Sequence, residues 1–455
     1  MTKNDGYLTD LFLEGLEKKA EQALPEEVVK EAKLSFIDYI ACAYLGQKIL
    51  KDKNEKTLAF LGNDSGNAIL IGTGKKVSSH TAAFMNGINA HVAELDDGHR
   101  YGMMHGGAPV ISVLLAVSGD KKVSGDKFIK GMVMGYEAAI RLAAAIQPGH
   151  KLKGCHATGT CGTVGAAMAA AYMLDFTKEE KKAALSAALT DAAGLLEMID
   201  NTSTLKPYNI GRAAVAGLDA ALAGISGFSG PYDAMGGKRG FLQLYAGEKV
   251  NYEYLLEGFG DKYVIQMIYR KPYAACRHCH AAIEAAMVCA KESGIDISDI
   301  KDIDIKTYGL AVGGHDHKEI SGTSSAKMST PYSVAAAIVS GQAGFQQFEE
   351  PYLSDERIAT LMDKVRVEED PELSKLVPDK RGAIAVISGQ DKEHTVRVDY
   401  PKGEPENPVT EKEMHDKFIS LLGAAGISEE KAEEMLEKVW KTDSEFDELL
   451  KTLAE

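Results

Sequence analysis

The stretch His91-Val-Ala-Glu-Leu-Asp-Asp-Gly-His-Arg-Tyr-Gly-Met-Met-His105 places three imidazoles, three carboxylates and one guanidinium within fifteen residues. Apolar sequence that is rich in small residues and typical of helices flanks it at 81–90 and 108–118. Charged groups are costly away from water unless another group pairs with them. A segment this polar between two segments this apolar therefore predicts the wall of a functional site in a helical domain. A solvated loop between two helices is the alternative, and two further polar clusters of the same kind favour the site.

The composition is that of a globular protein with more than one domain. The chain has 455 residues, of which 45% are hydrophobic and 26% charged, and it exceeds the size of one ordinary core. No apolar run reaches the roughly 20 residues that span a bilayer, and the first residues lack the apolar core of a secretory signal. Six cysteines are too few for a disulfide scaffold of this size. We expect a cytoplasmic protein that binds no membrane.

The net charge of −15 argues against a general nucleic-acid-binding protein. An anionic substrate remains compatible with it, because a site can be locally cationic on an acidic protein. Much of the acidity lies near the C-terminus, where residues 408–455 hold thirteen Asp and Glu against six Lys and Arg. This spacing is typical of a solvated pair of amphipathic helices.

The periodicity changes along the chain. Up to about residue 260, apolar residues recur at the three- and four-residue spacing of helices, and the Ala/Gly-rich stretches 162–174 and 213–225 predict central, closely packed helices. Beyond about residue 265, the segments 300–308, 365–368, 383–388 and 394–400 alternate as strands do, the last two as a hairpin, with helices predicted at 279–293 and 331–341.

These patterns predict a mainly α protein with a smaller α+β domain. We place a large all-helical domain at residues 1–266 and the α+β domain at 267–404. The proline-rich stretch 401–408 interrupts the pattern. Helices then resume at 405–455, and we expect them to return to the helical domain.

The second polar cluster surrounds His156, just before a Gly- and Thr-rich helix start that contains Gly159. Free N–H groups and the helix dipole at such a start favour a carboxylate or a phosphate. The glycine spacing differs from the dinucleotide-binding fingerprint and no strand precedes it, so we exclude a Rossmann site. A capped and buried helix start without a ligand is an equal alternative.

The third cluster centres on Lys206. Pro207 follows it, which biases Lys206 away from helical backbone and predicts that it projects from a loop. A lysine held against apolar elements can act as an acid or a base, or hold a substrate carboxylate. Most loop lysines are merely solvated; here the crowding by Pro, Asn, Gly and Arg over 207–212 favours a role.

The segment Cys276-Arg-His-Cys-His280 suggests several kinds of site. Covalent haem attachment does not fit, because no export signal is evident. Structural zinc lacks a second cysteine pair of suitable spacing, and a redox dithiol lacks the expected βαβ setting. We interpret Arg277, His278 and His280 as the functional residues. The His-x-His at 315–317 could ligate a metal, but is more simply a polar loop.

With these residues in view, almost the whole chain resembles the 2-methylcitrate dehydratase (MmgE/PrpD) family, which includes cis-aconitate decarboxylase and iminodisuccinate epimerase. The resemblance rests on an ordered set of motifs: Asn86-Gly, His91, Asp96-Asp97, His105, Gly135-Tyr136-Glu137, His156-x-x-Gly159, Lys206-Pro, Gly240-Phe241, Cys276-Arg-His-x-His280 and Lys327-x-Ser-x-Pro-Tyr332. It implies a helical domain closed by the C-terminal segment, an α+β lid, a homodimer and no metal or other cofactor. The residues similar to the family's site are Asp96, Asp97, His105, His156, Lys206 and His280.

One segment departs from the family pattern. Dehydratases and decarboxylases of the family usually have Asp-Phe-Asp-Asp-Thr followed by His-Pro-Ser, whereas this chain has Gly98 in place of the threonine and Gly106-Gly107 after His105. The hydroxyl is lost, and a His99-Arg100 pair is present.

The resemblance implies chemistry by proton abstraction next to a carboxylate. We expect a metal-independent lyase that dehydrates a small hydroxy-polycarboxylate, with Lys206 and His156 handling protons. His105 and His280 would orient or protonate the leaving group, and the anion-binding set would be Gly159, His99, Arg100, Arg277 and His278. Asp96 and Asp97 would fix the geometry of histidine or arginine side chains.

Three alternatives remain open. An epimerase of an iminodisuccinate-like dicarboxylate would need a second base, and Tyr136 opposite Lys206 could serve. A decarboxylase of a cis-aconitate-like acid would release carbon dioxide instead. A non-catalytic binding protein is the alternative from another class, and the joint presence of His105, His156 and Lys206 argues against it.

Overall fold

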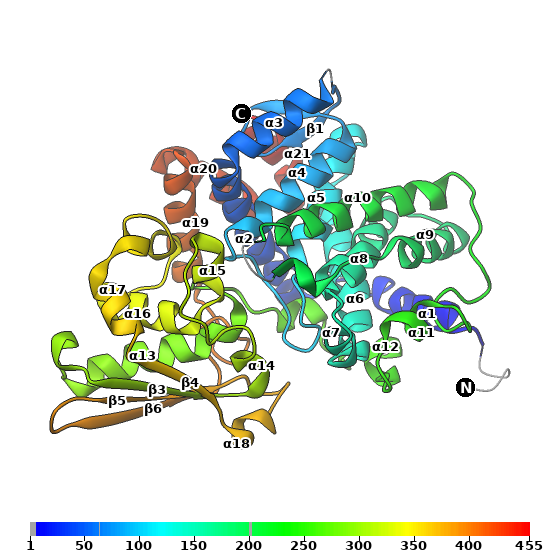
Figure 1. The fold of residues 1–455 in the computed structure, drawn as a ribbon. Coiled ribbons are helices and arrows are strands. Elements are labelled where there is room, and N and C mark those ends of the chain that lie inside the picture. The colour runs from blue at the N-terminus through cyan, green and yellow to red at the C-terminus, as the bar shows by residue number, and fades with distance from the viewer. Residues whose placement is uncertain (1–5, 63, 200–202) are drawn as a thin grey trace. The chain divides into compact units, whose positions relative to one another are not determined.

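The computed structural model of the protein describes residues 6–62, 64–199 and 203–455 (Figure 1). It consists of two compact units. Unit 1 contains Leu205–Ile268, Thr410–Glu455 and the described residues up to Met198, and unit 2 contains Tyr269–Val409. Unit 1 is almost entirely helical and unit 2 contains a four-stranded sheet. The predicted fold class, mainly α with a smaller α+β part, is confirmed.

Unit 1 begins with helices and returns to helices at its C-terminal end. Its elements are α1 (Leu8–Ala20), α2 (Glu26–Ile49), α3 (Lys51–Leu61), β1 (Ala68–Leu70), β2 (Lys75–Val77), α4 (Ser79–Val92), α5 (Gly107–Asp120), α6 (Gly125–Ile146), α7 (Gly149–Leu152), α8 (Ala157–Met173), α9 (Lys178–Asp191), α10 (Lys206–Ile225), α11 (Phe241–Tyr245), α12 (Tyr252–Leu256), α19 (Glu411–Ala425), α20 (Glu429–Trp440) and α21 (Thr442–Ala454).

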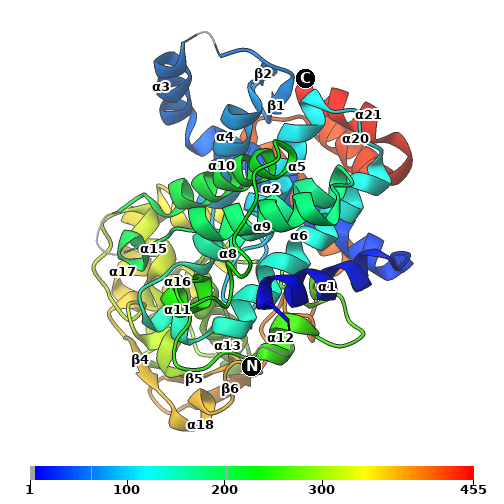
Figure 2. The same ribbon diagram turned by 90° about the vertical axis from the view of Figure 1, so that its right-hand side faces the viewer.

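Helix α8 is the centre of this unit. All of its residues are buried, and most are Ala, Gly or Thr. Helices α5, α6, α9 and α10 pack around it, and Figure 2 shows α8, α9 and α10 side by side. Small side chains allow helix backbones to approach closely, so a helix of this composition can be buried on every side. The predicted central helix at 162–174 is confirmed.

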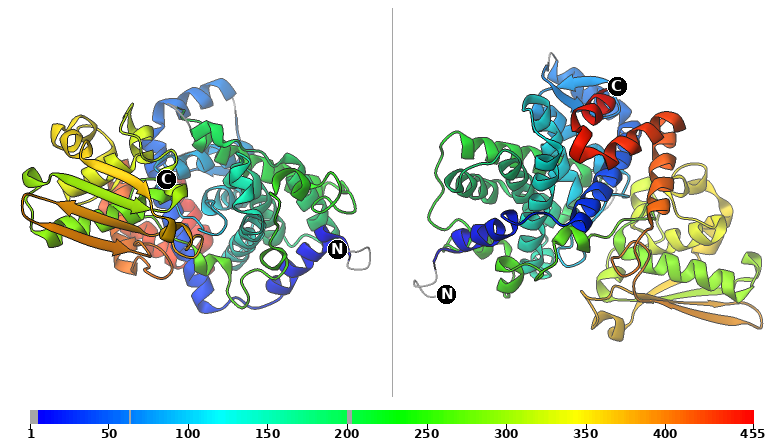
Figure 3. Two further views of the ribbon diagram at one scale, coloured as in Figure 1. Left: turned by 60° about the horizontal axis from the view of Figure 1, so that its bottom comes forward. Right: turned by 180° about the vertical axis from the view of Figure 1, so that it is seen from behind.

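The C-terminal helices complete the helical core. Helix α19 packs along α2, and α21 packs on α6 and β1 (Figure 3, right). Their apolar stripes are buried, whereas the acidic faces remain exposed. The prediction of amphipathic helices with a solvated acidic face is therefore confirmed. No helix among the described residues is both long and apolar enough to cross a bilayer.

A short hairpin interrupts the helices where we expected none. Strands β1 and β2 pair in antiparallel fashion, with Ala68 opposite Val77. Each strand has three residues, which is too short to show alternation in the sequence. Gly72 and Gly74 adopt positive φ in the turn between them, a backbone conformation that glycine adopts without strain.

Unit 2 is built on a mixed sheet with strand order β4-β3-β5-β6. Strand β3 pairs in parallel with β4 and antiparallel with β5, and β5 and β6 form the predicted hairpin. Its elements are α13 (His280–Ser293), β3 (Asp302–Thr307), α14 (Gly309–Val312), α15 (Thr323–Met328), α16 (Thr330–Ser340), α17 (Glu356–Met362), β4 (Val365–Glu369), α18 (Pro371–Ser374), β5 (Ala383–Ser388) and β6 (Glu393–Val398).

One face of this sheet is buried. Ile303 and Ile305 of β3 alternate with partly exposed residues, and Ile305 pairs with Ala385 of β5. Helices α13 and α16 pack on the sheet (Figure 1; Figure 3, left). A two-residue period with one buried face is what an antiparallel or mixed sheet covered on one side requires, which explains why the alternation in the sequence identified these strands.

Candidate active site

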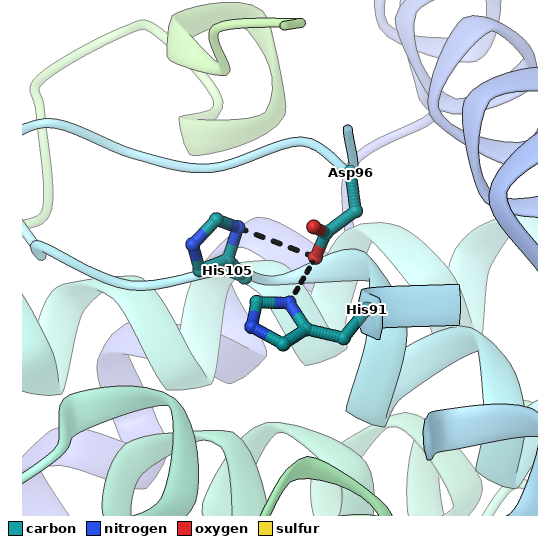
Figure 4. A group of neighbouring side chains, drawn as sticks. All are labelled: His91, Asp96 and His105. Atoms are coloured by element: carbon teal, nitrogen blue, oxygen red, sulfur yellow. Dashed lines mark hydrogen bonds and ion pairs between the residues drawn. The ribbon is translucent and has the colours of Figure 1, made fainter. Parts of the chain in front are cut away.

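Two histidines share one carboxylate where α4 ends and the segment that leads to α5 begins (Figure 4). Nδ1 of His91 lies 2.8 Å from Oδ2 of Asp96, and Nδ1 of His105 lies 3.2 Å from the same oxygen. The two imidazole rings meet edge to face, with centroids 4.7 Å apart. All three side chains are buried. The polar stretch identified in the sequence is therefore an internal cluster and not a solvated loop.

The contacts of His105 fix its tautomer. Its Nδ1 also lies 2.6 Å from the backbone carbonyl oxygen of Asp97. A carbonyl oxygen only accepts hydrogen bonds, so Nδ1 carries the hydrogen and Nε2 is the basic nitrogen of the neutral ring. A carboxylate that receives Nδ1–H and leaves Nε2 for chemistry is the arrangement by which many catalytic histidines are oriented.

Asp96 remains ionised in this setting. Burial by itself raises the pKa of a carboxyl group, but the charges and hydrogen bonds of His105 and His91 outweigh it and hold the pKa of Asp96 well below its usual range. Burial lowers the pKa of His91, against the attraction of Asp96 and Glu94, so that ring is neutral near neutral pH. The triad thus holds an ionised Asp96 next to a neutral His91.

The same three side chains have the spacing of a metal site. One ligand atom from each of His91, Asp96 and His105 lies within 4.8 Å of the others, and such a set would suit zinc or iron. The hydrogen-bond geometry fits a metal poorly. Because Nδ1 of His105 donates to the carbonyl oxygen of Asp97, it has no lone pair to offer in this direction. We therefore describe the group as a hydrogen-bonded triad.

Glu94 connects this triad to Lys206. Its carboxylate forms an ion pair with the Lys206 ammonium and lies 3.4 Å from Nε2 of His91. Glu94 is buried and adopts φ 57°, the left-handed region that residues other than glycine rarely occupy. Strain of this kind persists where the surroundings impose it, commonly at functional sites. It places the Glu94 carboxylate between the histidine and the lysine.

Lys206 does not lie in a loop, as the sequence had suggested. It is the first residue of helix α10, with Pro207 as the second. The first turn of a helix needs no partner for its N–H groups, so proline is well tolerated there. The restriction that proline imposes on the preceding residue was outweighed by the formation of the helix. Lys206 therefore projects from a helix start.

His156 is held by a separate hydrogen bond. Nδ1 of His156 lies 2.8 Å from Oδ1 of Asn209, and Nδ2 of Asn209 donates to the carbonyl oxygen of Ala193 at 3.2 Å. This second bond fixes the amide orientation, so that Oδ1 must accept from the histidine. Nδ1 of His156 is the protonated nitrogen and Nε2 carries the lone pair.

Gly159 makes room for this arrangement. A Cβ atom at this position would lie 2.1 Å from Oδ1 of Asn209 and 2.4 Å from the carbonyl oxygen of Ala193. The N–H of Gly159 bonds to the carbonyl oxygen of His156 at 3.1 Å. Glycine is therefore required by the close approach of α10 to the start of α8, and its N–H already has a partner within the helix.

Electrostatic coupling joins these residues into one site. Burial lowers the pKa of His156 to about 3, the Asn209 bond opposes this, and the charges of Lys206, His91 and His105 add to the lowering. Such coupling acts over short distances in a protein interior. His156 is thus a neutral imidazole at physiological pH, with a lone pair on Nε2.

Asp97 and Tyr136 stabilise the segment around Gly107 through hydrogen bonds. The Tyr136 hydroxyl donates to Oδ2 of Asp97 at 2.6 Å, and the N–H of Gly107 donates to Oδ1 at 3.0 Å. A Cβ at Gly107 would lie 2.8 Å from the Tyr136 hydroxyl oxygen, which explains why the chain has glycine after His105. Tyr136 is fully buried, and this hydrogen bond directs its hydroxyl to Asp97.

We expect Asp97→Asn to change how stability depends on pH. Burial, with the charge of Asp38 second, raises the pKa of Asp97 to about 6. Since the unfolded pKa is about 3.9, the folded protein retains this proton longer, and wild-type stability falls as pH rises from about 4 to about 6. The free energy of unfolding of the variant minus that of the wild type should increase by about 3 kcal/mol between these pH values and stay constant above them.

Urea unfolding of both proteins at a series of pH values measures this difference. The variant can keep both contacts, because its amide oxygen accepts from Gly107 and its amide N–H groups can donate to Tyr136. A difference in unfolding free energy that does not change between these pH values would contradict the assignment.

Helix α19 anchors the same segment through Lys417. Its ammonium contacts Oδ1 of Asp38 and donates to the carbonyl oxygen of Leu95 at 2.7 Å. The side chain of Asp38 is almost fully buried and that of Lys417 is largely so. This contact ties the backbone next to Asp96 to both α2 and the C-terminal helices of unit 1.

Replacing Lys417 by methionine should therefore destabilise unit 1. Breaking a buried ion pair by removing one partner costs about 3 kcal/mol, because the remaining charge stays buried. Lys412→Met is the matched control on the same helix. Its ion pair with Asp416 is exposed and should contribute less than about 0.5 kcal/mol. Chemical denaturation compares the two, and equal unfolding free energies would show that Lys417 is not an anchor.

His99 and Arg100 belong to the tight turn between Asp97 and His105. Nδ1 of His99 accepts from the N–H of Gly102 at 3.1 Å, and its ring packs edge-on against Phe259. The guanidinium of Arg100 lies over the Tyr101 ring. Both side chains are buried. These contacts stabilise the turn.

The remaining candidates lie in unit 2. Arg277 forms an ion pair with the buried Glu404, with Nη2 and Oε1 2.6 Å apart. Nδ1 of His280 lies 2.8 Å from Nη1 of Arg277, and Nε2 lies 3.1 Å from the carbonyl oxygen of Ala275. Nδ1 of His278 contacts the Tyr308 hydroxyl at 2.8 Å. The charge of Arg277 is thus balanced within its own unit.

Three residues that join the unit 1 cluster were not among those selected from the sequence as site residues: His91, Glu94 and Asn209. His91 and Glu94 were part of the polar stretch, and their three-residue spacing was a usable signal. Asn209 follows Lys206 by three residues, hence on the same face of α10. Its partnership with His156, 53 residues away, has no local signature.

Comparison with known proteins agrees with this description. The pattern of the MmgE/PrpD N-terminal domain matches residues 16–253, and that of the MmgE/PrpD C-terminal domain matches residues 273–442. The chain belongs to the MmgE/PrpD family. The first match falls within the helical unit 1, and the second covers unit 2 and continues through α19 and α20 of unit 1.

Several relatives in this MmgE/PrpD family have named activities. A cis-aconitate decarboxylase-like protein of Aspergillus oryzae is 27% identical over 89% of this chain and 88% of its own length. The human cis-aconitate decarboxylase is 23% identical over 87% of this chain and 83% of its own. The 2-methylcitrate dehydratase of Escherichia coli is 26% identical over 51% of this chain and 50% of its own.

Proposed function

We propose that the protein is a metal-independent lyase that dehydrates a small hydroxy-polycarboxylate resembling citrate or 2-methylcitrate. The observation that carries this proposal is the cluster in unit 1, where Glu94 pairs with Lys206 and contacts His91 of the buried triad of His91, Asp96 and His105, and where the charge of Lys206 contributes to the lowered pKa of His156. Elimination next to a carboxylate needs a base for the α-proton, an acid for the leaving hydroxyl and positive charge for the developing enolate.

Each of these parts has a candidate. His156 offers Nε2 as the base that removes the α-proton, because Asn209 holds its Nδ1 as the donor. Lys206 supplies the positive charge for the enolate and can return a proton. His105, oriented through Nδ1, would protonate the departing hydroxyl from Nε2 once it carries a second proton. Asp96 stabilises that imidazolium and serves as a positioning residue.

The other candidates receive supporting roles in this proposal. Tyr136 and Asp97 hold the backbone around Gly107, and Gly159 leaves room for Asn209. His99 and Arg100 shape the turn that carries His105. In unit 2, Glu404 already balances Arg277, and His280 bonds to it, so we propose that this pair positions the start of α13 next to His278.

Independence from metal rests on the donor geometry of His105. We expect exhaustive dialysis against EDTA, with metal analysis of the product, to leave turnover unchanged. Loss of turnover that is restored by one divalent metal would instead favour the metal-ligand interpretation of the same three side chains.

Decarboxylation of a cis-aconitate-like acid is the second candidate. Relatives named cis-aconitate decarboxylase or cis-aconitate decarboxylase-like match 72–89% of this chain, whereas the match to the named dehydratase covers about half. Loss of carbon dioxide needs no acid for a leaving hydroxyl, only charge to stabilise the carbanion and a proton to quench it, which Lys206 and His156 could supply. An epimerase would need a second base on the opposite face of the substrate. Tyr136 was the candidate for that base, but its hydroxyl donates to Asp97.

Proton NMR in D₂O distinguishes these reactions. The purified protein would be incubated separately with citrate, 2-methylcitrate, cis-aconitate and iminodisuccinate. A new alkene signal from a hydroxy acid supports dehydration, and an alkene product with loss of carbon dioxide from cis-aconitate supports decarboxylation. Deuterium entering an α-position without other change supports epimerisation. No reaction with any of the four compounds would contradict the proposed substrate class and favour a binding role.

We also propose that the protein is a cytoplasmic homodimer. Six free cysteines suit a reducing compartment. Large apolar side chains are exposed at the end of α10 and just beyond it, at Ile225, Phe228 and Tyr232, the last two more than 70% exposed. Contiguous exposed apolar surface commonly marks an interface. Light scattering of the purified protein should give twice the mass of the chain, and the monomer mass would contradict this.

A further inference from the structure

A thiol and an imidazole face each other in unit 2. Sγ of Cys276 lies 3.6 Å from Nε2 of His315. Nδ1 of His315 lies 2.8 Å from the backbone carbonyl oxygen of Met328. Because that oxygen can only accept, Nδ1 carries the hydrogen, and Nε2 is left to accept the thiol proton. A cysteine, a histidine and a third group that orients the histidine are the parts of an activated thiol.

The two partners are anchored to the same segment of the chain. The N–H of Cys276 donates to the carbonyl oxygen of Lys327 at 2.8 Å, and the N–H of Thr330 donates to that of His315 at 2.8 Å. The Ser329 hydroxyl donates to the carbonyl oxygen of His317 at 2.6 Å. Residues 327–330 therefore fix the backbone on both sides of the thiol–imidazole pair, which keeps their separation constant.

The neighbouring side chains restrict the ring of His315. The ring of His278 lies against it, with centroids 5.3 Å apart and planes tilted by 31°, and the other side of His278 contacts the Tyr308 hydroxyl. His315 is itself only 7% exposed. The imidazole thus cannot rotate away from the thiol without disturbing packed neighbours.

Cys276 differs from the other cysteines in its surroundings. Cys42, Cys161, Cys279 and Cys289 are buried, and only Cys155 and Cys276 are partly exposed. Burial raises the pKa of the Cys155 thiol, with the charge of Lys153 opposing it. Cys155 is therefore a partly exposed thiol whose surroundings favour the protonated form, and it provides an internal comparison for Cys276.

We propose that Cys276 is a nucleophilic thiol, activated by His315, at which soft electrophiles and hydroperoxides modify the protein. The thiol proton moves from Sγ to Nε2 of His315, and the thiolate attacks. With an alkyl halide, a sulfur–carbon bond forms and halide leaves. With a hydroperoxide, a sulfur–oxygen bond forms and the oxygen–oxygen bond breaks. The released oxygen takes the proton from His315, which leaves a sulfenic acid and an alcohol or water.

Iodoacetamide labelling of the native full-length protein tests this proposal. The labelling rate of each cysteine is read by peptide mass spectrometry near neutral pH. In the wild type, Cys276 should react at least about ten-fold faster than Cys155, because only the thiolate is nucleophilic. This comparison needs no variant. A rate at Cys276 equal to or below that at Cys155 would overturn the proposal.

Two variants locate the cause of the reactivity. His315→Gln should slow labelling of Cys276 about ten-fold while leaving Cys155 unchanged, since the rate follows the thiolate fraction. Continued protection of Cys279 and Cys289, which are buried in unit 2, reports that the fold of this unit is retained. His317→Gln, in the same loop, is the matched control and should leave both rates unaltered. An unchanged Cys276 rate in His315→Gln would show that the imidazole does not activate the thiol.

Oxidation provides an independent readout. After treatment with hydrogen peroxide, a dimedone adduct should form on Cys276 in the wild type and on no residue in Cys276→Ser. Adduct formation at Cys155 in preference to Cys276 would contradict the assignment.

Discussion

Replacing Lys206 by methionine should lower kcat/KM at least about 10³-fold, equivalent to about 4 kcal/mol of transition-state stabilisation. The ammonium of Lys206 is the cationic member of the cluster that forms the ion pair with Glu94 and adds to the lowered pKa of His156. Without it, the developing enolate meets a buried carboxylate instead of a positive charge. Steady-state kinetics with the substrate found by NMR measures the loss.

Lys206→Arg separates charge from proton transfer. Arginine keeps the positive charge but stays protonated under all relevant conditions. If Lys206 transfers a proton, the arginine variant should be nearly as inactive as the methionine variant. If it only supplies charge, substantial activity should return, and the proton-transfer role would be abandoned while the binding role is kept.

The control for this prediction is another lysine in an ion pair of unit 1. Lys182 pairs with Asp10 at 2.6 Å, and both side chains are partly exposed. Lys182→Met should change kcat/KM less than about two-fold, because a pair of this kind contributes little even to stability. Should Lys206→Met retain more than about a tenth of wild-type kcat/KM, the proposed mechanism fails.

Much of the fold follows from local patterns in the sequence. The alternation at 300–308 and 383–388 identified β3 and β5 because one face of their sheet is buried. The Ala- and Gly-rich stretch at 162–174 identified α8 because only small side chains permit burial on all sides. The hairpin of β1 and β2 was not predicted, since three-residue strands carry no readable period.

The site was only partly predictable, for a physical reason. The polar stretch around His105 stands out because charge between apolar helices must find partners. Which partner each group finds depends on packing between distant segments. Arg277 meets Glu404, 127 residues away, and His156 meets Asn209. Neither pairing has a local sequence signature. The sequence therefore identified the polar groups but did not show which of them form pairs.

Glu94 illustrates the same limit within a single segment. Its sequence context ends helix α4, where glycine or asparagine would be the usual residue in left-handed backbone. Nothing local favours glutamate there. The ion pair with Lys206 from α10 accounts for a strained acidic residue at this position, and this contact is visible in the structure alone.

Replacing Asp96 by asparagine should lower kcat about 10³-fold with little change in KM. The amide is almost isosteric with the carboxylate, but it no longer offers a charged acceptor to both imidazoles. If its N–H groups face the histidines, Nδ1 of His91 must accept and its proton moves to Nε2, while His105 keeps Nδ1–H through the Asp97 carbonyl oxygen but faces a donor in place of a carboxylate. If its oxygen faces them, the tautomers survive but the imidazolium of His105 loses its counter-charge.

Asp97→Asn provides the matched control for this variant. Asp97 is the next residue, is equally buried, and contacts Gly107 and Tyr136 through its carboxylate, whereas its contact with His105 uses the backbone carbonyl. Its replacement should cost less than about ten-fold in kcat, because the orientation of the ring is retained. The contrast between two adjacent aspartates separates ring orientation from a general effect of removing a buried charge.

A spectroscopic readout separates positioning from structural damage. Nitrogen-15 NMR of the histidine side chains distinguishes the Nδ1–H from the Nε2–H tautomer, and the wild type should show Nδ1–H at His105. A shift of His91 toward Nε2–H in Asp96→Asn, with Nδ1–H kept at His105 by the Asp97 carbonyl and an unchanged unfolding transition, identifies Asp96 as the residue that sets the tautomer of His91. Wild-type kcat in this variant, or equal losses in both aspartate variants, would show that Asp96 does not support His105 as the acid. The catalytic role would then fall to His156 and Lys206, with the three-residue cluster of His91, Asp96 and His105 acting only to shape the fold of unit 1.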